Sequence, residues 1–370
     1  MITPSAPPAR SETMAARPAR ERRASPWRWA RPALVLGGLS VALLAVAVLS
    51  VAVGDTPIPP SAVIGMALQW LPIHPARAWS DTDLNIITQI RMPRVVTGIL
   101  VGGALAVTGT AFQALFRNPL ADPGFVGTSA GASVGAVVAF VLPAPLQGVL
   151  FGFTLVPLAA FVGALGATVL VYTLARVGGR VPSTTLLLAG FAVSAILNAV
   201  SALVETLSDR LRDMYIWLLG SIANNTGEQL GVAAPLVVLG VVGLFALSGE
   251  LNVLLLGDEQ AHYLGIDATR RRLLILALGS LLASVAVALG GLIALVGLLV
   301  PHITRLLVGA NHRLLLPASL LLGSIFLVVV DMVARLALSG EELPVGLITA
   351  LVGAPWFIVL LRRKKGEYAF

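Results

Sequence analysis

The chain alternates long apolar runs with short polar connections, and this pattern predicts membrane-spanning helices. A spanning helix needs about 20 mostly apolar residues. Runs of about that length predict ten spans, near 33–53, 93–115, 124–142, 151–175, 184–205, 229–248, 273–290, 291–309, 314–337 and 343–361. The expected fold class is therefore all-α, in the form of a polytopic integral membrane protein with about ten transmembrane helices.

Two connections between the predicted spans differ from ordinary loops. Segment 206–228 is polar with a short apolar centre, MYIWLLGSI, which predicts a short helix at the membrane surface. Segment 248–272 contains LNVLLL followed by DEQAHYLG, which predicts two short surface helices. Such a platform fits either a docking surface for a partner protein or an interfacial amphipathic segment without one. The residue pattern leaves both alternatives open.

Composition agrees with a membrane protein. The chain is 57% hydrophobic and 12% charged, whereas a soluble domain carries about 25% charged residues. The absence of cysteine excludes a disulfide, a thiolate metal site and a cysteine nucleophile. Residues 1–31 are rich in Ala, Pro and Arg, which predicts a disordered basic tail ahead of a transmembrane domain over 32–370. The first apolar run is long for a signal-peptide core, which favours an uncleaved helix.

The positive charges predict an orientation rather than a nucleic-acid partner, although the sequence pI is about 10.7. With ten spans and a cytoplasmic N-terminus, 19 of the 25 Lys and Arg residues fall on the inner face and 6 on the outer face. Cytoplasmic loops of membrane proteins carry this excess of Lys and Arg. We therefore expect both termini in the cytoplasm and no binding of nucleic acid.

Several chemistries lack the residues that they need. A P-loop requires Lys after its glycines, and the only lysines are Lys364 and Lys365. No HExxH motif is present, and four scattered His predict no metal site. Acidic residues cluster at span ends, as Asp331 does, which disfavours an ion-coupled secondary transporter. Energy for any transport is then expected from another subunit.

The stretch RNPLADPGFVGTSAGASVGA, residues 117–136, contains a GxSxG pattern centred on Ser129. An intramembrane serine protease would pair Ser129 with a His, and His302 is the candidate at a span end. The alternative, which we prefer, is a small-residue face for helix packing. Pro119 and Pro123 end helices, so the chain is expected to turn here and re-enter the membrane beside a pathway.

At these residues the chain resembles the FecCD/BtuC-type permeases, the membrane subunits of bacterial ABC importers for iron–siderophore complexes, haem and vitamin B12. Besides RMPRVVTGILVGGALAVTGTAFQALFRNPLADPGFVGTSAGASVGA, the matching motifs are STTLLLAG, GDEQAHYLGI, GLIALVGLLVPHITRLLVGANHRLLLP and ELPVGLITALVGAPWFIVLL. The resemblance implies the type II ABC importer fold, with ten helices per subunit and no ATPase site in this chain. It also implies a homodimer, two cytoplasmic ATPase subunits that use ATP and Mg, a periplasmic binding protein and a bacterial inner-membrane location.

The resemblance also implies roles for particular residues. Segment 248–272 would carry the coupling helices, with ATPase contacts at Gly257, Asp258, Glu259, Ala261, Tyr263, Leu264 and Gly265. The inner gate would comprise Asn118 and Leu120, after the second helix, with Thr184 and Thr185, before the fifth. Docking of the binding protein would use Arg91, Arg94 and Arg335.

The cargo is expected to be an iron-containing chelate, and the form NPLADPG is most similar to the haem branch. An iron–siderophore complex or vitamin B12 is the alternative, and no single residue decides between them. Haem propionates would be attracted by Arg210 and Arg212 on the outer face, although these arginines also balance Asp209 and Asp213 as a solvated cluster. We expect no cofactor bound to this chain itself.

Overall fold

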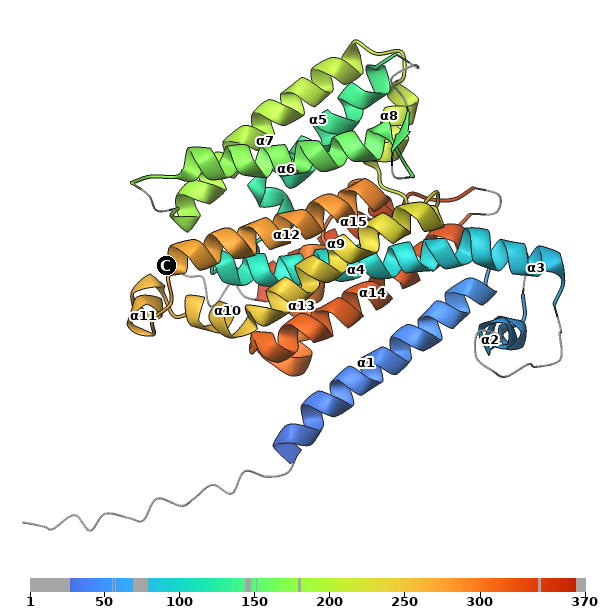
Figure 1. Cartoon of the computed structure of the whole chain (residues 1–370), viewed down its shortest axis with the longest axis horizontal. Helices are drawn as coiled ribbons and strands as arrows, with labels where there is room; N and C mark the ends of the chain where they lie inside the picture. The colour runs from blue at the N-terminus through green and yellow to red at the C-terminus, as the bar shows by residue number, and fades with distance from the viewer. Residues whose placement is uncertain are drawn as a thin grey trace, which may run out of the picture.

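The computed structural model describes residues 27–54, 56, 58–68, 79–143, 148–150, 152–178, 181–338 and 341–363, which fold almost wholly into helices (Figure 1). Within these residues, seven helices are long and apolar enough to cross a membrane: α1 (Trp27–Ala52), α4 (Met92–Leu115), α6 (Leu155–Ala175), α7 (Ser183–Thr206), α9 (Gly227–Ala246), α12 (Ala268–Gly290) and α14 (His312–Leu336). Three shorter apolar helices accompany them: α5 (Thr128–Val141), α13 (Val296–Val308) and α15 (Val345–Arg363).

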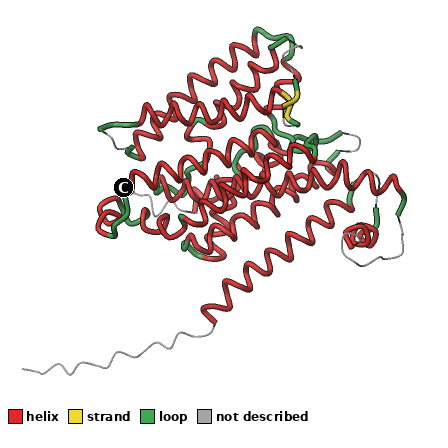
Figure 2. The backbone as a smooth tube through the Cα atoms, in the orientation of Figure 1, coloured by secondary structure: helices red, strands yellow, loops and turns green. Residues whose placement is uncertain are grey.

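The other described elements are short, and the strand content is a single small hairpin (Figure 2). They are α2 (Pro60–Leu68), α3 (Asp81–Asn85), the π-helix η1 (Ile86–Arg91), the 3₁₀ helix η2 (Pro123–Val126), α8 (Leu211–Leu218), α10 (Ser248–Leu254), α11 (Asp258–Tyr263), β1 (Val149–Leu150) and β2 (Phe153–Thr154). The segments α3, η1 and α4 follow one another without a break. The short helices α8, α10 and α11 confirm the helices that the two unusual connections predict.

Each of the ten predicted spans coincides with one of the apolar helices, but two helices are shorter than predicted. Helix α5 starts only at Thr128, because η2 and the left-handed Gly127 precede it. Helix α13 starts only at Val296, because Gly291 and Leu295 both take positive φ and interrupt the helical path. Helix α1 already begins at Trp27, inside the predicted tail, while residues 1–26 lie outside the described residues.

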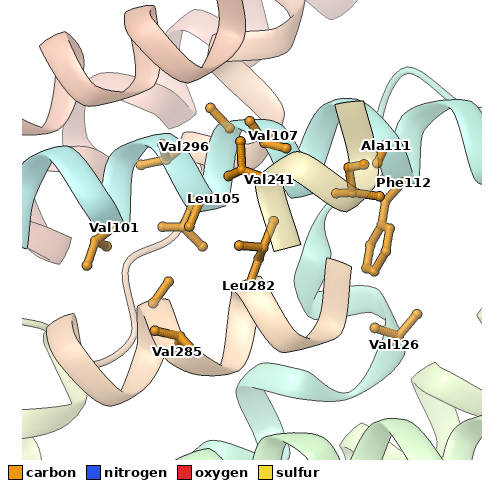
Figure 3. Packing of buried hydrophobic residues seen from close by; sticks show 14 of the residues in the cluster. Val101, Leu105, Val107, Ala111, Phe112, Val126, Val241, Leu282, Val285 and Val296 are labelled. Atoms are coloured by element: carbon orange, nitrogen blue, oxygen red, sulfur yellow. The ribbon is translucent and has the colours of Figure 1, made fainter. Parts of the chain in front are cut away.

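Helix α4 lies at the centre of the bundle and packs against α9, α12, α13 and α14. A Cβ at Gly109 would lie 1.8 Å from the carbonyl oxygen of Gly297, and one at Gly102 would lie 2.3 Å from that of Gly323. Helices that approach this closely require glycine, and small residues are what membrane helices use for tight packing. Branched and aromatic side chains such as Phe112 fill the space around α4 (Figure 3).

The bundle has two sides and two ends, which carry different helices (Figure 1). Helices α5, α6 and α7 form a group on one side of the bundle, and α1 lies on the opposite side. Helices α10 and α11 lie at one end of the bundle, which we call the α11 end. Helices α2 and α3 lie at the other end, which we call the α3 end.

Candidate functional site

The turn after α4 carries the predicted gate residues Asn118 and Leu120, and we call residues 116–124 the gate turn. The amide of Arg117 donates to the carbonyl of Ala114 at 3.1 Å, and the amide of Asn118 donates to that of Gln113 at 3.0 Å. This pair of bonds is a Schellman cap, which satisfies the last carbonyls of a helix. Oδ1 of Asn118 then accepts from the amide of Leu120 at 2.9 Å. The turn therefore has a defined shape of its own.

Asp122 joins the gate turn to η2. Its Oδ1 accepts a hydrogen bond of 2.9 Å from the amide of Gly124 and caps this short helix. Burial raises the pKa of Asp122, and the bond from Gly124 opposes that rise. Pro123 lies against α13, because a Cβ at Gly297 would be 2.7 Å from the Pro123 ring. The chain thus turns while packed against other helices and re-enters the bundle as α5, as the sequence predicts.

The small residues of α5 form a packing face. A Cβ at Gly131 would lie 2.2 Å from the carbonyl oxygen of Gly163 on α6, so the two backbones touch. The ring of His302, the proposed partner of Ser129 in a protease, packs edge-on against Trp356 with centroids 5.1 Å apart. The geometry agrees with the packing interpretation of this stretch.

The second predicted gate segment lies beside the first. The hydroxyl of Ser183, the first residue of α7, donates to the carbonyl of Leu115, the last residue of α4, at 3.3 Å. Because α7 begins at Ser183, Thr184 and Thr185 belong to its first turn. From the sequence, they were expected in the loop before this helix. Thr184 is exposed and Thr185 is half-buried. Their role as a gate stays a prediction.

Helices α10 and α11 carry the predicted ATPase contacts. Ala261 is fully buried and anchors α11, while Tyr263 and Leu264 are 78% and 60% exposed. Gly257 and Gly265 take positive φ at the two ends of α11, where a side chain would strain the backbone. An apolar pair directed outward from a short, anchored helix is a surface that a partner protein can bind.

The α11 end also holds a charge cluster around Asp258. Arg272 of α12 donates to both carboxylate oxygens of Asp258, at 2.8 and 2.5 Å, and Arg117 of the gate turn contacts the same carboxylate. A groove of about 930 Å³ borders this cluster, and its lining includes Pro182, Asp258, Glu259, His262 and Arg272. The groove thus lies between α11 and the start of α7.

Two of the predicted docking arginines are bound to the C-terminus of α1 at the α3 end. Arg91 donates to the carbonyls of Val51, Ala52 and Thr56, at 2.7, 3.1 and 2.6 Å. Arg335 donates to the carbonyls of Val53 and Ser50, at 2.9 and 3.1 Å, and to the Ser50 hydroxyl at 2.8 Å. The last carbonyls of a helix carry partial negative charge, so cations stabilise them.

The third arginine belongs to a buried ion cluster. Arg94 donates through Nε to Asp331 at 2.9 and 3.1 Å, and through Nη1 to both oxygens of Glu342 at 2.8 Å. Nε of Arg335 lies 3.2 Å from Oδ2 of the same carboxylate. The side chains of Arg94, Arg335 and Asp331 are only 8%, 10% and 2% exposed. Two arginines thus share one buried carboxylate that links α4 to α14.

The three arginines predicted to dock the binding protein all make contacts within this chain. Arg91, Arg94 and Arg335 are largely buried, bind groups of this same chain and together line a pocket of about 290 Å³. Docking through them stays a prediction, and it requires that these contacts open. A signal was present in the sequence, because a carboxylate such as Asp331 in an apolar helix needs a cationic partner, and Arg335 lies one turn further along.

Other residues singled out from the sequence lie on the surface. Arg210 and Arg212 are exposed at the start of α8, as are Asp209 and Asp213. Exposed charges of both signs in one segment agree with a solvated cluster. Among the described residues, no group of three or more His, Asp or Glu is arranged to hold a metal ion.

The arrangement is that of a helical membrane protein with a packed turn after α4 and a groove between α11 and the start of α7. Comparison with known proteins identifies the family. The model of the FecCD transport family matches residues 42–363. The chain belongs to the FecCD transport family. It is 46% identical to the cobalamin import system permease of Halobacterium salinarum over 286 residues, which cover 77% of this chain and 75% of the relative.

Two further matches support this assignment. The haemin transport system permease of Yersinia pestis is 39% identical over 290 residues, covering 78% of this chain and 86% of the relative. A solved metal-chelate type ABC transporter in an inward-facing conformation superimposes with a TM-score of 0.77 at 31% identity, covering 90% of this chain and 99% of the solved chain. The fold class predicted from the sequence is therefore confirmed.

Family membership establishes the general activity. The chain is the multi-pass permease subunit of an ABC importer for iron chelates, haem or vitamin B12, and it is not itself catalytic. ATP is used by the partner ATPase, and a binding protein delivers the cargo. The relatives do not single out the haem branch that the sequence motif favoured, since cobalamin and haemin permeases both match.

Proposed function

We propose that two copies of this chain form a pore that imports a metal–tetrapyrrole complex, with a cobalamin-type corrinoid as the first candidate and haem as the second. Corrinoids and haem share a large, rigid macrocycle around a metal. The cobalamin permease at 46% identity favours a corrinoid, and the haemin permease at 39% keeps haem as the alternative. This preference revises the choice of haem that rests on the motif NPLADPG.

The main support for a pore between two subunits is the exposed face of α7. Only 17% of the span in α7 is buried within the subunit. One stripe of this helix is exposed along its whole length, and it consists of Thr184, Leu188, Phe191, Ala195, Asn198 and Ala202. The spacing of three and four residues places these side chains on one face. Lipid disfavours an Asn amide at mid-span, so this face is suited to a second subunit and an aqueous path.

The α11 end fits the cytoplasmic side. The gate turn, the start of α7 and helices α10 and α11 all lie at this end. Arg270, Arg271 and Arg272, as well as Arg305 and Arg313, lie in the same region, at the ends of α12, α13 and α14. An excess of arginine is the mark of a cytoplasmic face. The ATPase then docks on α10 and α11, and the binding protein docks at the α3 end.

Transport by the reconstituted complex tests the cargo. The homodimer with its ATPase and binding protein is placed in proteoliposomes, and uptake of cyanocobalamin, haemin and ferric citrate is measured with and without internal ATP. We expect ATP-dependent uptake of cyanocobalamin, with haemin second. Uptake of ferric citrate alone would overturn the proposal of a tetrapyrrole cargo. Cross-linking of α7 between subunits, described in the Discussion, tests the pore.

A further inference from the structure

Arg117 connects the gate turn to both helices of the coupling segment. Its Nε donates to the carbonyl of Leu254, the last residue of α10, at 3.0 Å. Its Nη2 contacts the carboxylate of Asp258, the first residue of α11. One guanidinium therefore holds the end of one short helix and the beginning of the next. Arg272 fixes the same carboxylate to α12.

The backbone conformation at Arg117 would suit glycine better than arginine. The arginine is therefore explained by the contacts of its side chain. Arg117 has φ 50°, a left-handed conformation, at the position of the Schellman cap where glycine is the usual residue. A non-glycine residue is strained in this conformation, because its Cβ comes too close to the following carbonyl oxygen. Glycine would end α4 with less strain, so the strained arginine is best explained by the contacts of its guanidinium. Local strain of this kind is enriched at functional sites.

The same helix end reaches the second gate segment. The carbonyl of Leu115 accepts the hydroxyl of Ser183, which immediately precedes Thr184 and Thr185. A continuous path of contacts therefore runs from Asp258 through Arg117 to the end of α4, and from there to the start of α7.

We propose that Arg117 is the positioning residue that transmits movement of α10 and α11 to both gate segments. The proposal rests on the proposed function, in which an ATPase moves this pair of helices. When α10 and α11 shift together, the guanidinium carries the gate turn with them, and the bond between Leu115 and Ser183 carries the start of α7. Without the guanidinium, the ATPase still binds to α11, but its movement no longer reaches the gate.

The variant Arg117→Gly tests whether Arg117 transmits movement to the gate segments or only supports the fold. Glycine relieves the left-handed strain, and an exposed ion pair such as this one contributes little to stability, so we expect the fold to be retained. Arg117→Lys keeps a charge but loses the forked donor set that reaches two acceptors. Arg270→Ala is the matched control, since Arg270 pairs with Asp267 at 3.1 Å on the same surface but touches no gate segment.

The measurement is the number of cargo molecules imported per ATP hydrolysed in proteoliposomes, together with the amount of ATPase that co-purifies. We expect Arg117→Gly to retain the ATPase and its basal hydrolysis, and to lower the ratio of cargo to ATP by at least about fivefold. Arg117→Lys should lower the ratio less, and Arg270→Ala should leave it unchanged.

Four outcomes are distinguishable. An unchanged ratio in Arg117→Gly overturns the positioning role. Loss of the ATPase from Arg117→Gly overturns it as well, since Arg117 would then belong to the docking surface. Retention of the ATPase after residues 257–265 are replaced by a Gly/Ser linker contradicts the part of the proposed function that places the ATPase on α10 and α11, whatever the ratio is. An equal loss in Arg117→Gly, Asp258→Asn and the double variant supports the proposal, because the two residues then act as one unit.

Discussion

At the scale of single residues, the buried cluster at the α3 end shows how much of a charged side chain's role depends on its neighbours. In the sequence, Arg94 is a cation near the end of a predicted span. In the fold, it neutralises Asp331 and binds Glu342. Breaking a buried ion pair leaves an uncompensated charge, which costs about 3–5 kcal/mol. The same substitution at an exposed arginine costs little.

We therefore expect Arg94→Met to destabilise the permease, with a lower midpoint of thermal unfolding in detergent. Arg212→Met, at an exposed site on α8, is the control and should leave the midpoint unchanged. Binding-protein docking should be measured only on variants that keep their folding midpoint, because a misfolded α3 end would also weaken docking. Equal midpoints for the two variants would contradict the buried-cluster interpretation.

A second prediction at this scale concerns the gate. Thr184 is exposed in the first turn of α7, on the face proposed to meet a second subunit. In a chain without cysteine, Thr184→Cys should form a cross-link between subunits in at least one nucleotide state, detected as a dimer on a non-reducing gel. Val162→Cys, on the exposed face of α6, should not form one. If the thiol of Thr184→Cys is reactive but stays unlinked in every state, this position does not belong to the gate.

At the scale of elements, the contact between α5 and α6 depends on glycine. Gly131→Val would place a branched side chain where even a Cβ comes within 2.2 Å of the carbonyl oxygen of Gly163. We expect this variant to separate the two helices and to lower the yield of folded protein, because packing is what holds membrane helices together. Ser129→Ala should be nearly silent, and a fluorophosphonate probe should leave Ser129 unlabelled. Labelling of Ser129 would revive the protease alternative.

The coupling segment supplies the second prediction at the element scale. Replacing residues 257–265 with a Gly/Ser linker removes α11 together with its exposed Tyr263 and Leu264. The spans do not depend on this segment, so insertion into the membrane should persist while the ATPase is lost during purification. Replacing residues 211–218, which form α8 at the α3 end, should leave the ATPase bound and serves as the control. A stable complex with unchanged transport would show that the ATPase docks elsewhere.

At the scale of the whole molecule, the distribution of charge predicts orientation. The α11 end carries most of the arginines, so we expect it to face the cytoplasm. In right-side-out vesicles, a membrane-impermeant maleimide should label Asp209→Cys, between α7 and α8, and should not label Glu259→Cys on α11 until the membrane is opened. Both positions are exposed, so access rather than burial decides the result. The reverse pattern would invert the proposed topology.

The sequence by itself determined the helical membrane class, the positions of the apolar helices and the short helices α8, α10 and α11. These features follow from local hydrophobicity, which the chain carries residue by residue. It also indicated that small residues such as Gly131 form a packing face. The sequence did not predict that α13 starts only at Val296, because an apolar run does not show that Leu295 takes a positive φ.

Only the tertiary structure decided which charges meet. Arg94 lies 237 positions from Asp331, and Arg117 lies 141 positions from Asp258, so no local pattern joins them. Their pairing depends on how α4 packs against α14 and on where α10 and α11 fold back to the end of α4. An arginine at the end of a span has several possible partners: a headgroup, another protein, a helix terminus or a distant carboxylate. Packing selects among them, because a buried charge must be placed against an opposite one.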